Sequence, residues 1–293
     1  MADEVTQRIT GQTELLGLMA SPVRHSQSPR LHNLALSKLG LPYAYLCFEV
    51  DGSNLERAVQ GFKALKVRGW NVSMPNKIEI LKYLDRLTPA VELVGACNTV
   101  INDEGVLTGV VTDGTGYMQA LREDGVDVIH QKMTIMGCGG AGTAIAMQAA
   151  LDGVRAIDIY SRRDESWHSA AATAATINDR TGATAVLREL ADVERFRESV
   201  AGSVLLVNAT NVGMGVLEGQ SVLPDVRVLR ADLFVSDIVY SPSRTAFLDQ
   251  AAAAGCRFSN GIGMMCHQGA AAFRLWTGHD MPLDYVREHL FAV

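Results

Sequence analysis

A glycine-rich turn between an apolar strand and an alanine-rich helix is the feature that most constrains the fold of this chain. The run KMTIM (132–136) has the composition of a buried strand, residues 137–142 read G-C-G-G-A-G, and residues 141–151 have helical composition. A second apolar strand, AIDIY (156–160), follows. The first glycine permits a tight turn, the second permits close approach of a pyrophosphate, and the third permits close helix–strand packing. Residues 132–164 are therefore predicted to form a βαβ unit that binds a dinucleotide at the helix start.

The loop after the second strand bears on which dinucleotide binds. Ser161, Arg162, Arg163 and Asp164 stand where such folds place the adenosine ribose. A carboxylate there accepts hydrogen bonds from the ribose 2′-hydroxyl of NAD, whereas an arginine accommodates the 2′-phosphate of NADP. Asp164 favours NAD, and the two arginines leave NADP open. The alternative is a glycine turn that only packs, followed by a solvated charged loop.

Apolar runs alternate with helical patterns through most of the chain, which is typical of an α/β protein with a mostly parallel sheet. Further strands are predicted at 14–20, 43–50, 70–74, 184–190, 203–209 and 233–240, with a hairpin at 98–112. Helices are predicted at 54–67, 75–84, 165–178, 245–254, 267–276 and 283–291. Another helix is expected to start at Ser28 as N-cap, with Pro29 as its first residue, and to end before Gly40.

Composition excludes several classes of protein. The 293 residues carry a net charge of −6 with acidic and basic residues interspersed, so a nucleic-acid partner is not expected. The five cysteines (Cys47, Cys97, Cys138, Cys256 and Cys266) form no C-x-x-C pair, and the histidines lack metal-ligand spacing, so neither a disulfide framework nor a metal site is predicted. The N-terminus has no apolar signal core and no run could cross a membrane. A cytoplasmic protein with a small-molecule substrate is expected.

Three polar stretches follow predicted strands. They are H-S-Q-S-P (25–29), N-V-S-M-P-N-K (71–77) and T-D-G-T-G (112–116). Ligands of open α/β sheets lie beyond the carboxyl ends of the strands, so these hydroxyls, amides, the lysine and the carboxylate suit a polyhydroxylated carboxylic acid. The opposing interpretation is that Ser28 and Asp113 are only helix caps and Lys77 only a surface charge.

These motifs, in this order, resemble those of the shikimate dehydrogenase family. The similarity includes G-L-M-A-S-P-V-x-H-S-x-S-P-x-x-H-N (17–33), N-V-S-M-P-N-K, G-A-C-N-T-V (95–100), T-D-G-T-G and G-C-G-G-A (137–141). It continues through A-T-N-V-G-M (209–214), I-V-Y-S-P (238–242) and G-I-G-M-M-x-H-Q-G-A (261–270), and so covers nearly the whole chain. Within the family, Ser73 and the S-R-R-D loop look most like the quinate/shikimate dehydrogenase branch.

The resemblance implies two domains with an active-site cleft between them. The first is an N-terminal α/β substrate domain, residues 1–113, completed by C-terminal helices 267–293. The second is a Rossmann-type, doubly wound NAD(P)-binding domain, residues 114–266. The implied reaction is reversible oxidation of quinate or shikimate to the 3-dehydro ketone, in aromatic amino acid biosynthesis or quinate metabolism, by a monomer or homodimer.

The resemblance also implies site residues. Lys77 and Asp113 fall on the catalytic pair. The substrate-binding positions are Ser26, Ser28, Ser73, Asn98, Tyr240 and Gln268. The cofactor-binding positions are Gly137, Cys138, Gly139, Gly140, Ala141, Ser161, Arg162, Arg163, Asp164, Asn211, Ile238 and Gly263. Two departures from the family pattern are Cys138, where alanine is usual, and Asn211, where close relatives can have lysine.

Hydride transfer needs a group that takes the hydroxyl proton, and Lys77 is the expected base. Burial would lower its pKa from about 10.4, whereas the carboxylate of Asp113 would raise it, and the sequence leaves open which effect is larger. NAD is the expected cofactor, with NADP possible. Three alternatives stay open: a strictly NADP-linked biosynthetic shikimate dehydrogenase, a relative acting on an amino-substituted analogue, and a catalytically silent module that senses cofactor or substrate.

Overall fold

The computed structural model describes residues 9–164 and 166–291 and divides into two compact units. Unit 1 comprises the described residues up to 112 together with those from 268 onward, and unit 2 comprises residues 113–267. The prediction about an N-terminal signal segment, the first residue of the helix predicted at 165–178 and the last two of the C-terminal segment lie outside the described residues.

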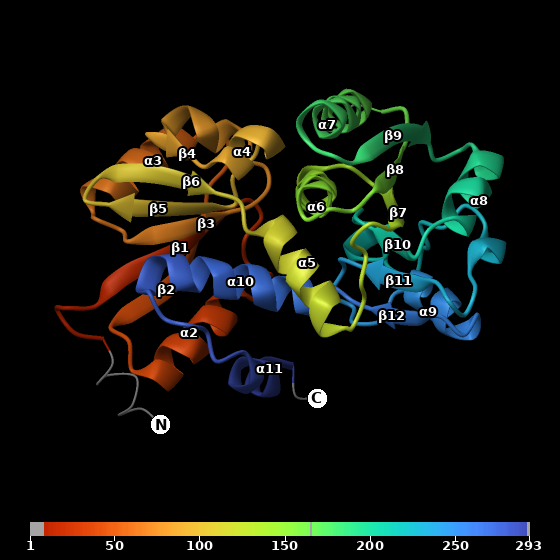
Figure 1. Ribbon diagram of the computed structural model, residues 1–293. Coiled ribbons are helices and arrows are strands. Elements are labelled where there is room, and N and C mark those ends of the chain that lie inside the picture. Colours follow the sequence, from red (N-terminus) through yellow and green to blue (C-terminus); the bar gives the residue numbers. More distant parts are fainter. Residues whose placement is uncertain (1–8, 165, 292–293) are drawn as a thin grey trace. The chain divides into compact units, whose positions relative to one another are not determined.

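Unit 1 is built on a six-stranded mixed sheet, called sheet A, with strand order β2-β1-β3-β5-β6-β4 (Figure 1). Its strands are β1 (Glu14–Ala20), β2 (Tyr43–Glu49), β3 (Gly69–Val72), β4 (Arg86–Leu87), β5 (Thr99–Asp103) and β6 (Val106–Val110). The first three run parallel, whereas β5 pairs antiparallel with both β3 and β6. The hairpin predicted at 98–112 therefore forms as β5 and β6, and it supplies the antiparallel part of this sheet.

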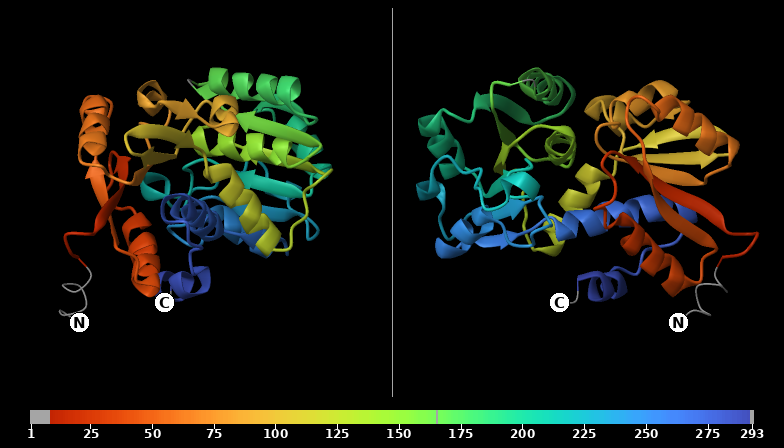
Figure 2. Two further views of the ribbon diagram at one scale, coloured as in Figure 1. Left: turned by 60° about the vertical axis from the view of Figure 1, so that its left-hand side comes forward. Right: turned by 180° about the vertical axis from the view of Figure 1, so that it is seen from behind.

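Helices cover both faces of sheet A (Figures 1 and 2). They are α2 (Ser28–Leu39), α3 (Leu55–Ala64), α4 (Pro89–Val94), α10 (Ile262–Thr277), α11 (Leu283–Phe291) and the 3₁₀ turn η1 (Glu79–Tyr83). On one face the ring of Phe62 in α3 packs edge-on against Trp70 of β3. On the other face His32 of α2 stacks on Tyr45 of β2, 4.3 Å between centroids, beside Trp276 of α10. These buried rings hold the strands that lead to the polar stretches.

Unit 2 is built on a six-stranded sheet, called sheet B, whose strands are all parallel in the order β12-β11-β10-β7-β8-β9. The strands are β7 (Lys132–Met136), β8 (Ala156–Ser161), β9 (Thr184–Glu189), β10 (Leu205–Asn208), β11 (Phe234–Asp237) and β12 (Arg257–Ser259). The strand order reverses direction between β7 and β10. Doubly wound sheets bind ligands at the carboxyl ends of their strands at such a switch point.

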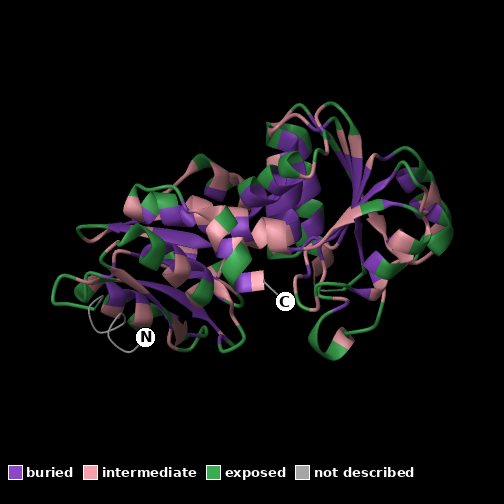
Figure 3. Ribbon diagram, turned by 90° about the horizontal axis from the view of Figure 1, so that it is seen from below, coloured by how far each residue is buried: buried purple, intermediate pink, exposed green. Residues whose placement is uncertain are grey.

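The helices of unit 2 are α5 (Asp113–Glu123), α6 (Gly140–Leu151), α7 (Ser166–Arg180), α8 (Val193–Ala201) and α9 (Ala246–Ala253), with 3₁₀ turns η2 (Gly215–Leu217) and η3 (Val226–Val228). In Figure 1, α6 and α7 cover one face of sheet B, and α8 and α9 lie on the other. A buried cluster that includes Tyr160, Phe196 and Phe247 fills the space under α8 and α9. Figure 3 shows both sheets as mostly buried ribbons. Burial of their apolar side chains stabilises the strands from which the loops at the strand ends extend.

Three predicted elements differ from the structure. Residues 74–78 form a turn that leads into η1, not a helix from 75 to 84. Ser28 is the first residue of α2 and Gln27 occupies the N-cap position without a side-chain bond, so the expected capping role of Ser28 is wrong. Helix α10 begins at Ile262, five residues before the predicted start at 267.

Helices α4, α5 and α8 and strands β4 and β12 were not predicted. Among the described residues, no helix is long and apolar enough to cross a membrane, and no cluster of three His, Cys, Asp or Glu side chains is placed to hold a metal ion.

Candidate functional site

Ser26 and Ser28 lie at the start of α2, just beyond the carboxyl end of β1, and both are half-buried. The Ser28 backbone N–H donates to the Ser26 hydroxyl at 3.2 Å. Burial raises the pKa of the Cys47 thiol, and a hydrogen bond with the Ser26 side chain opposes that shift. Burial likewise raises the pKa of Tyr45, opposed by the Ser28 side chain. Both serine side chains therefore lie next to side chains of β2.

A chain of buried hydrogen bonds continues from these serines across sheet A. The Tyr45 hydroxyl donates to Asn71 Oδ1 at 2.7 Å, and Asn71 Nδ2 donates to the Asn98 carbonyl at 3.2 Å. The Thr112 N–H donates to Asn98 Oδ1 at 2.8 Å, and Asn98 Nδ2 donates to the Thr112 hydroxyl at 3.0 Å. The structure thus brings Ser28 and Asn98 into one network. Sequence reasoning missed Tyr45 as a member, whereas Asn71 and Thr112 lie inside motifs that it singled out.

The loop that carries Ser73 and Lys77 is fixed by bonds to three other segments of unit 1. The Ser73 N–H donates to the Met19 carbonyl at 2.9 Å. Asn76 is buried, and its Nδ2 donates to the Val50 carbonyl at 2.7 Å. The Lys77 carbonyl accepts the Cys97 N–H at 2.8 Å. The backbone on both sides of the half-buried Lys77 side chain is therefore held in place, as a group that must meet a substrate hydroxyl requires.

The other predicted substrate residues are divided between the two units. Asp113 is the buried first residue of α5 in unit 2, directly after Thr112. Gln268 lies in the part of α10 that belongs to unit 1. Tyr240 follows β11 in unit 2, and burial raises the pKa of its phenol. Because Lys77 and Asp113 belong to different units, their pairing stays a prediction.

The glycine-rich turn joins β7 to α6 in unit 2. Gly137 has φ +93°, a left-handed conformation that favours glycine, and its N–H donates to the Tyr160 carbonyl at 2.8 Å. A Cβ on Gly142 would lie 2.3 Å from the Gly137 carbonyl oxygen, so only glycine lets the helix pack this closely. Gly139 occupies the N-cap position of α6, and a Cβ there would meet nothing within 4 Å. Packing thus requires the first and last glycines, whereas Gly139 faces open space.

Cys138, the departure from the family pattern within this turn, is almost completely buried. Its thiol lies 3.5 Å from the Thr143 hydroxyl. Burial raises the pKa of the thiol, and hydrogen bonds with Thr143 and Thr173 oppose the shift. The thiol of Cys138 is therefore a buried, packed side chain. Gly140 and Ala141 are the first two residues of α6.

The loop after β8 carries the four residues predicted to contact the ribose. Asp164 Oδ1 accepts hydrogen bonds from the Ser166 hydroxyl at 2.6 Å and the Ser166 N–H at 3.0 Å, and these bonds lower the pKa of Asp164. Arg162 Nε lies 3.3 Å from the other carboxylate oxygen. The guanidinium of Arg163 lies over the ring of Trp167 and its Nε is 3.0 Å from Glu189. The loop therefore presents an ionised carboxylate next to Arg162, and a second exposed cation, Arg163, that is paired with Glu189.

Ser161, Asn211, Ile238 and Gly263 complete the predicted cofactor residues. The Ser161 hydroxyl lies 3.1 Å from that of Ser166, at the carboxyl end of β8. Asn211 is exposed in the loop after β10, and Ile238 follows β11 directly, with its N–H bonded to the Asn208 carbonyl at 3.0 Å. Gly263 lies on α10, where a Cβ would come within 3.0 Å of Ala120. Ser161 ends a strand of sheet B, and Asn211 and Ile238 follow two others, so all three lie at the edge that the carboxyl ends of the parallel strands share.

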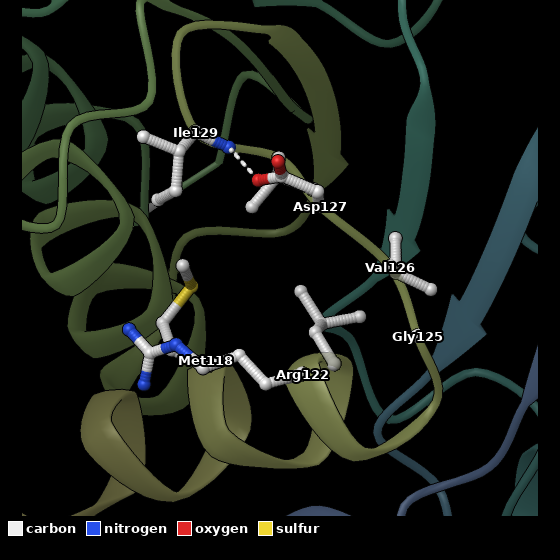
Figure 4. A pocket seen from close by; sticks show the side chains of 8 residues that line it. Met118, Arg122, Gly125, Val126, Asp127 and Ile129 are labelled. Atoms are coloured by element: carbon white, nitrogen blue, oxygen red, sulfur yellow. Dashed lines mark hydrogen bonds between the residues drawn. The ribbon is translucent and has the colours of Figure 1, made fainter.

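A cavity of about 330 Å³ lies elsewhere in unit 2, at the end of α5 (Figure 4). Its lining residues are Met118, Leu121, Arg122, Gly125, Val126, Asp127, Val128 and Ile129. Arg122 is paired with Asp152 at 2.6 Å, and Asp127 accepts the Ile129 N–H. None of the predicted substrate or cofactor residues lines this cavity.

Two family models match the chain. The model of the shikimate dehydrogenase substrate binding domain matches residues 18–100, and the shikimate 5′-dehydrogenase C-terminal domain matches residues 261–291. A curated relative from Listeria monocytogenes serotype 4b (strain F2365), named shikimate dehydrogenase (NADP(+)), is 55% identical over 291 residues, covering 99% of this chain and 100% of the relative.

Solved structures give the same family. The shikimate 5-dehydrogenase of Listeria monocytogenes, in complex with shikimate and NAD, is 56% identical with a TM-score of 0.94, over 97% of this chain and 98% of that chain. The quinate dehydrogenase of Corynebacterium glutamicum, in complex with NAD, is 28% identical with a TM-score of 0.86, over 96% and 99% of the two chains. The relatives above 50% identity thus bear the shikimate name, and quinate dehydrogenase is a more distant neighbour.

Proposed function

The chain belongs to the shikimate dehydrogenase family, and from that premise we propose that it catalyses the reversible oxidation of shikimate to its 3-dehydro ketone with a nicotinamide dinucleotide. The name of the 55% identical relative supports NADP as the cofactor and favours the NADP-linked alternative over a quinate-directed enzyme. One observation of the structure carries the proposal. Gly139 opens α6 at the switch point of a parallel sheet, with free space where its Cβ would lie.

The residues of unit 2 fit a dinucleotide. The start of α6 offers backbone N–H groups and the positive end of the helix dipole to a pyrophosphate, and Gly139 leaves room for its approach. Arg162 is exposed and would pair with a 2′-phosphate. When bound, the dinucleotide supplies the hydride acceptor.

Most of the residues that we assign to the acid belong to unit 1. We assign Ser26 and Ser28 to the substrate carboxylate. Their hydroxyls lie beyond a strand end and can donate hydrogen bonds to the carboxylate without placing a full positive charge beside it. Asn98 and Gln268 orient ring hydroxyls, and Ser73 and Tyr240 border the same ligand. Lys77 takes the proton of the reacting hydroxyl, and Asp113 holds the lysine amine in position. In the reverse direction the protonated amine of Lys77 stabilises the developing alkoxide.

A second cofactor assignment is NAD, which one observation favours. Asp164 is held by Ser166 in its ionised form, and a carboxylate at this position accepts hydrogen bonds from a free ribose 2′-hydroxyl. The same carboxylate repels a 2′-phosphate, and Arg162 offsets that repulsion.

Initial rates with shikimate and with quinate, each with NAD and with NADP, test the proposal. Reduction of the dinucleotide is followed by the absorbance of the reduced nicotinamide. We expect the highest kcat/KM with shikimate, and the ratio between the two cofactors decides between NADP and NAD. A higher kcat/KM with quinate would return the assignment to the quinate branch, and no reduction in any of the four mixtures would refute the proposed function.

A further inference from the structure

Asp237, the last residue of β11, lies under the loops at the switch point of sheet B. Its side chain is 1% exposed. The carboxylate accepts three hydrogen bonds, from Asn208 Nδ2 at 2.9 Å, the Val239 N–H at 3.0 Å and the Thr245 hydroxyl at 2.7 Å. These donors come from the end of β10, the loop after β11 and the start of α9. One carboxylate therefore joins three segments of unit 2.

Asp237 also fixes the direction of the Asn208 side-chain amide. An ionised carboxylate only accepts hydrogen bonds, so Asn208 must turn its NH₂ group toward Asp237 and its oxygen away. Asn208 Oδ1 then accepts the N–H of Thr210 at 3.0 Å and its hydroxyl at 2.7 Å. The Thr210 hydroxyl in turn accepts the Val212 N–H at 3.1 Å. Asn208 Nδ2 also donates to the Val212 carbonyl at 3.1 Å, so Asp237 and this carbonyl together orient the amide that holds the loop after β10.

This loop packs directly against the glycine-rich turn. A Cβ on Gly137 would lie 2.5 Å from Thr210 Cγ2 and 3.0 Å from the Ala209 carbonyl carbon, and a Cβ on Gly142 would lie 3.3 Å from that of Ala209. The turn therefore packs against Thr210 and Ala209 with no room for a methyl group on Gly137. Asp237, Asn208, Thr210 and Gly137 form a continuous path of contacts along the carboxyl ends of the neighbouring strands β11, β10 and β7.

We propose that Asp237 is a positioning residue for the dinucleotide, which holds the glycine-rich turn in its binding geometry through Asn208 and Thr210. The inference rests on the proposed function, because it takes the turn as the dinucleotide site. The same carboxylate accepts the Val239 N–H and thereby holds the backbone of the loop after β11. Ile238 and Tyr240 are the residues on either side of Val239 in that loop.

The path gives dinucleotide affinity a dependence on pH. Burial raises the pKa of Asp237 to about 6, and the hydrogen bonds from Val239, Thr245 and Asn208 oppose the shift. The neighbours from β10 and α9 are uncharged. Tyr117 of α5 is a titratable group whose pKa is raised by its burial and by the charges of Asp124 and Asp237, and a hydrogen bond with Ser236 opposes the shift. A protonated carboxyl is a weaker hydrogen-bond acceptor than a carboxylate, so protonation of Asp237 weakens its bonds from Asn208 and Val239, and affinity is expected to fall as the pH drops below about 6.

The test measures the dissociation constant of the reduced dinucleotide by its fluorescence, for the full-length wild type and for Asp237→Asn. The matched control is Asp232→Asn, which removes a carboxylate that is 80% exposed and paired with Arg230. At neutral pH, Asp237→Asn should bind about tenfold more weakly, the effect of losing about one charged hydrogen bond. Asp232→Asn should bind as the wild type does.

A pH series from about 8 to about 5 adds a readout that a general structural role would not change. It uses NADH, because the 2′-phosphate of NADPH titrates in the same range. If NADH binds too weakly, the difference between wild type and Asp237→Asn with NADPH replaces it. We expect wild-type affinity to fall with a midpoint near 6 and the Asp237→Asn series to be flat.

Equal affinity of wild type and Asp237→Asn at neutral pH would overturn the proposal. If Asp237→Asn does not fold, the pH series of the wild type and the dinucleotide affinity of Thr245→Val are measured in its place. A wild-type affinity that does not change with pH refutes the role of Asp237. Binding is measured without shikimate. Failure of wild-type turnover with shikimate therefore refutes the proposed function alone, and an unchanged affinity in Asp237→Asn refutes this inference alone.

Discussion

Two glycines of the same turn, Gly139 and Gly142, should respond in opposite ways to a single added methyl group. A Cβ on Gly139 would meet nothing within 4 Å, and its φ of −76° suits alanine. A Cβ on Gly142 would lie 2.3 Å from the Gly137 carbonyl oxygen, which is backbone and has no rotamer to change. Gly139→Ala therefore tests ligand approach, and Gly142→Ala tests packing.

The magnitudes follow from these contacts. Gly142→Ala must displace helix α6 from the turn, and such overpacking costs about 1–3 kcal/mol. Gly139→Ala should change the free energy of unfolding by less than about 1 kcal/mol, the usual effect of an N-cap change. If the pyrophosphate occupies the space beside Gly139, the methyl group instead weakens dinucleotide binding by about 1–3 kcal/mol, roughly 5- to 150-fold in Kd.

Thermal unfolding without ligand and fluorescence titration with reduced dinucleotide measure the two effects separately. We expect Gly142→Ala to lower Tm by several degrees. We expect Gly139→Ala to keep Tm and lose affinity. Wild-type affinity in Gly139→Ala would show that the space beside this glycine does not receive the dinucleotide, and the reasoning from the turn would be refuted.

Three further predictions concern single side chains. Asp164→Ser should raise the ratio of kcat/KM with NADP to that with NAD, because it removes an ionised carboxylate next to Arg162, and an unchanged ratio would contradict a role at the ribose. Ser28→Ala should raise the KM for shikimate while leaving the Kd of the dinucleotide unchanged, and equal KM values would remove Ser28 from the substrate residues. Burial lowers the pKa of His32 from its usual 6.5 to about 3, so unfolding takes up a proton below about pH 6.5. The contribution of neutral, buried His32 to the free energy of unfolding is fully present above that pH and falls as the pH drops toward 3. The free energy of unfolding is lower by about 2 kcal/mol near pH 5 for this reason. His32→Phe should therefore show a flatter fall of Tm between pH 6.5 and 4, and an unchanged acid limb would contradict the burial effect.

The glycine-rich turn could be predicted because its determinants are local. The conformation of Gly137, the start of α6 and the strands on either side follow from consecutive residues, and the structure places each of them as expected. The sequence also singled out the polar motifs of unit 1 as candidate site residues. Their arrangement could not be predicted, because the network through Tyr45, Asn71 and Asn98 joins residues that the sheet alone makes neighbours.

Two errors have the same cause, which is tertiary contact overriding local preference. Helix α5 was missed because Gly114 and Gly116 have low helix propensity. The structure uses Gly114 for packing, since a Cβ there would lie 2.3 Å from the Ala144 carbonyl oxygen of α6. The helix predicted from Pro75 fails because the buried Asn76 amide bonds to the Val50 carbonyl and holds this segment as a turn.

The most direct test of the account is shikimate-dependent reduction of the dinucleotide by the wild type and by Lys77→Ala, measured side by side. The wild type should reduce the dinucleotide. Lys77→Ala should lose about 10²- to 10⁴-fold in kcat, the contribution of a general base, while its Kd for the reduced dinucleotide stays unchanged. No reduction by the wild type, or near-normal turnover by Lys77→Ala, would contradict the proposed mechanism.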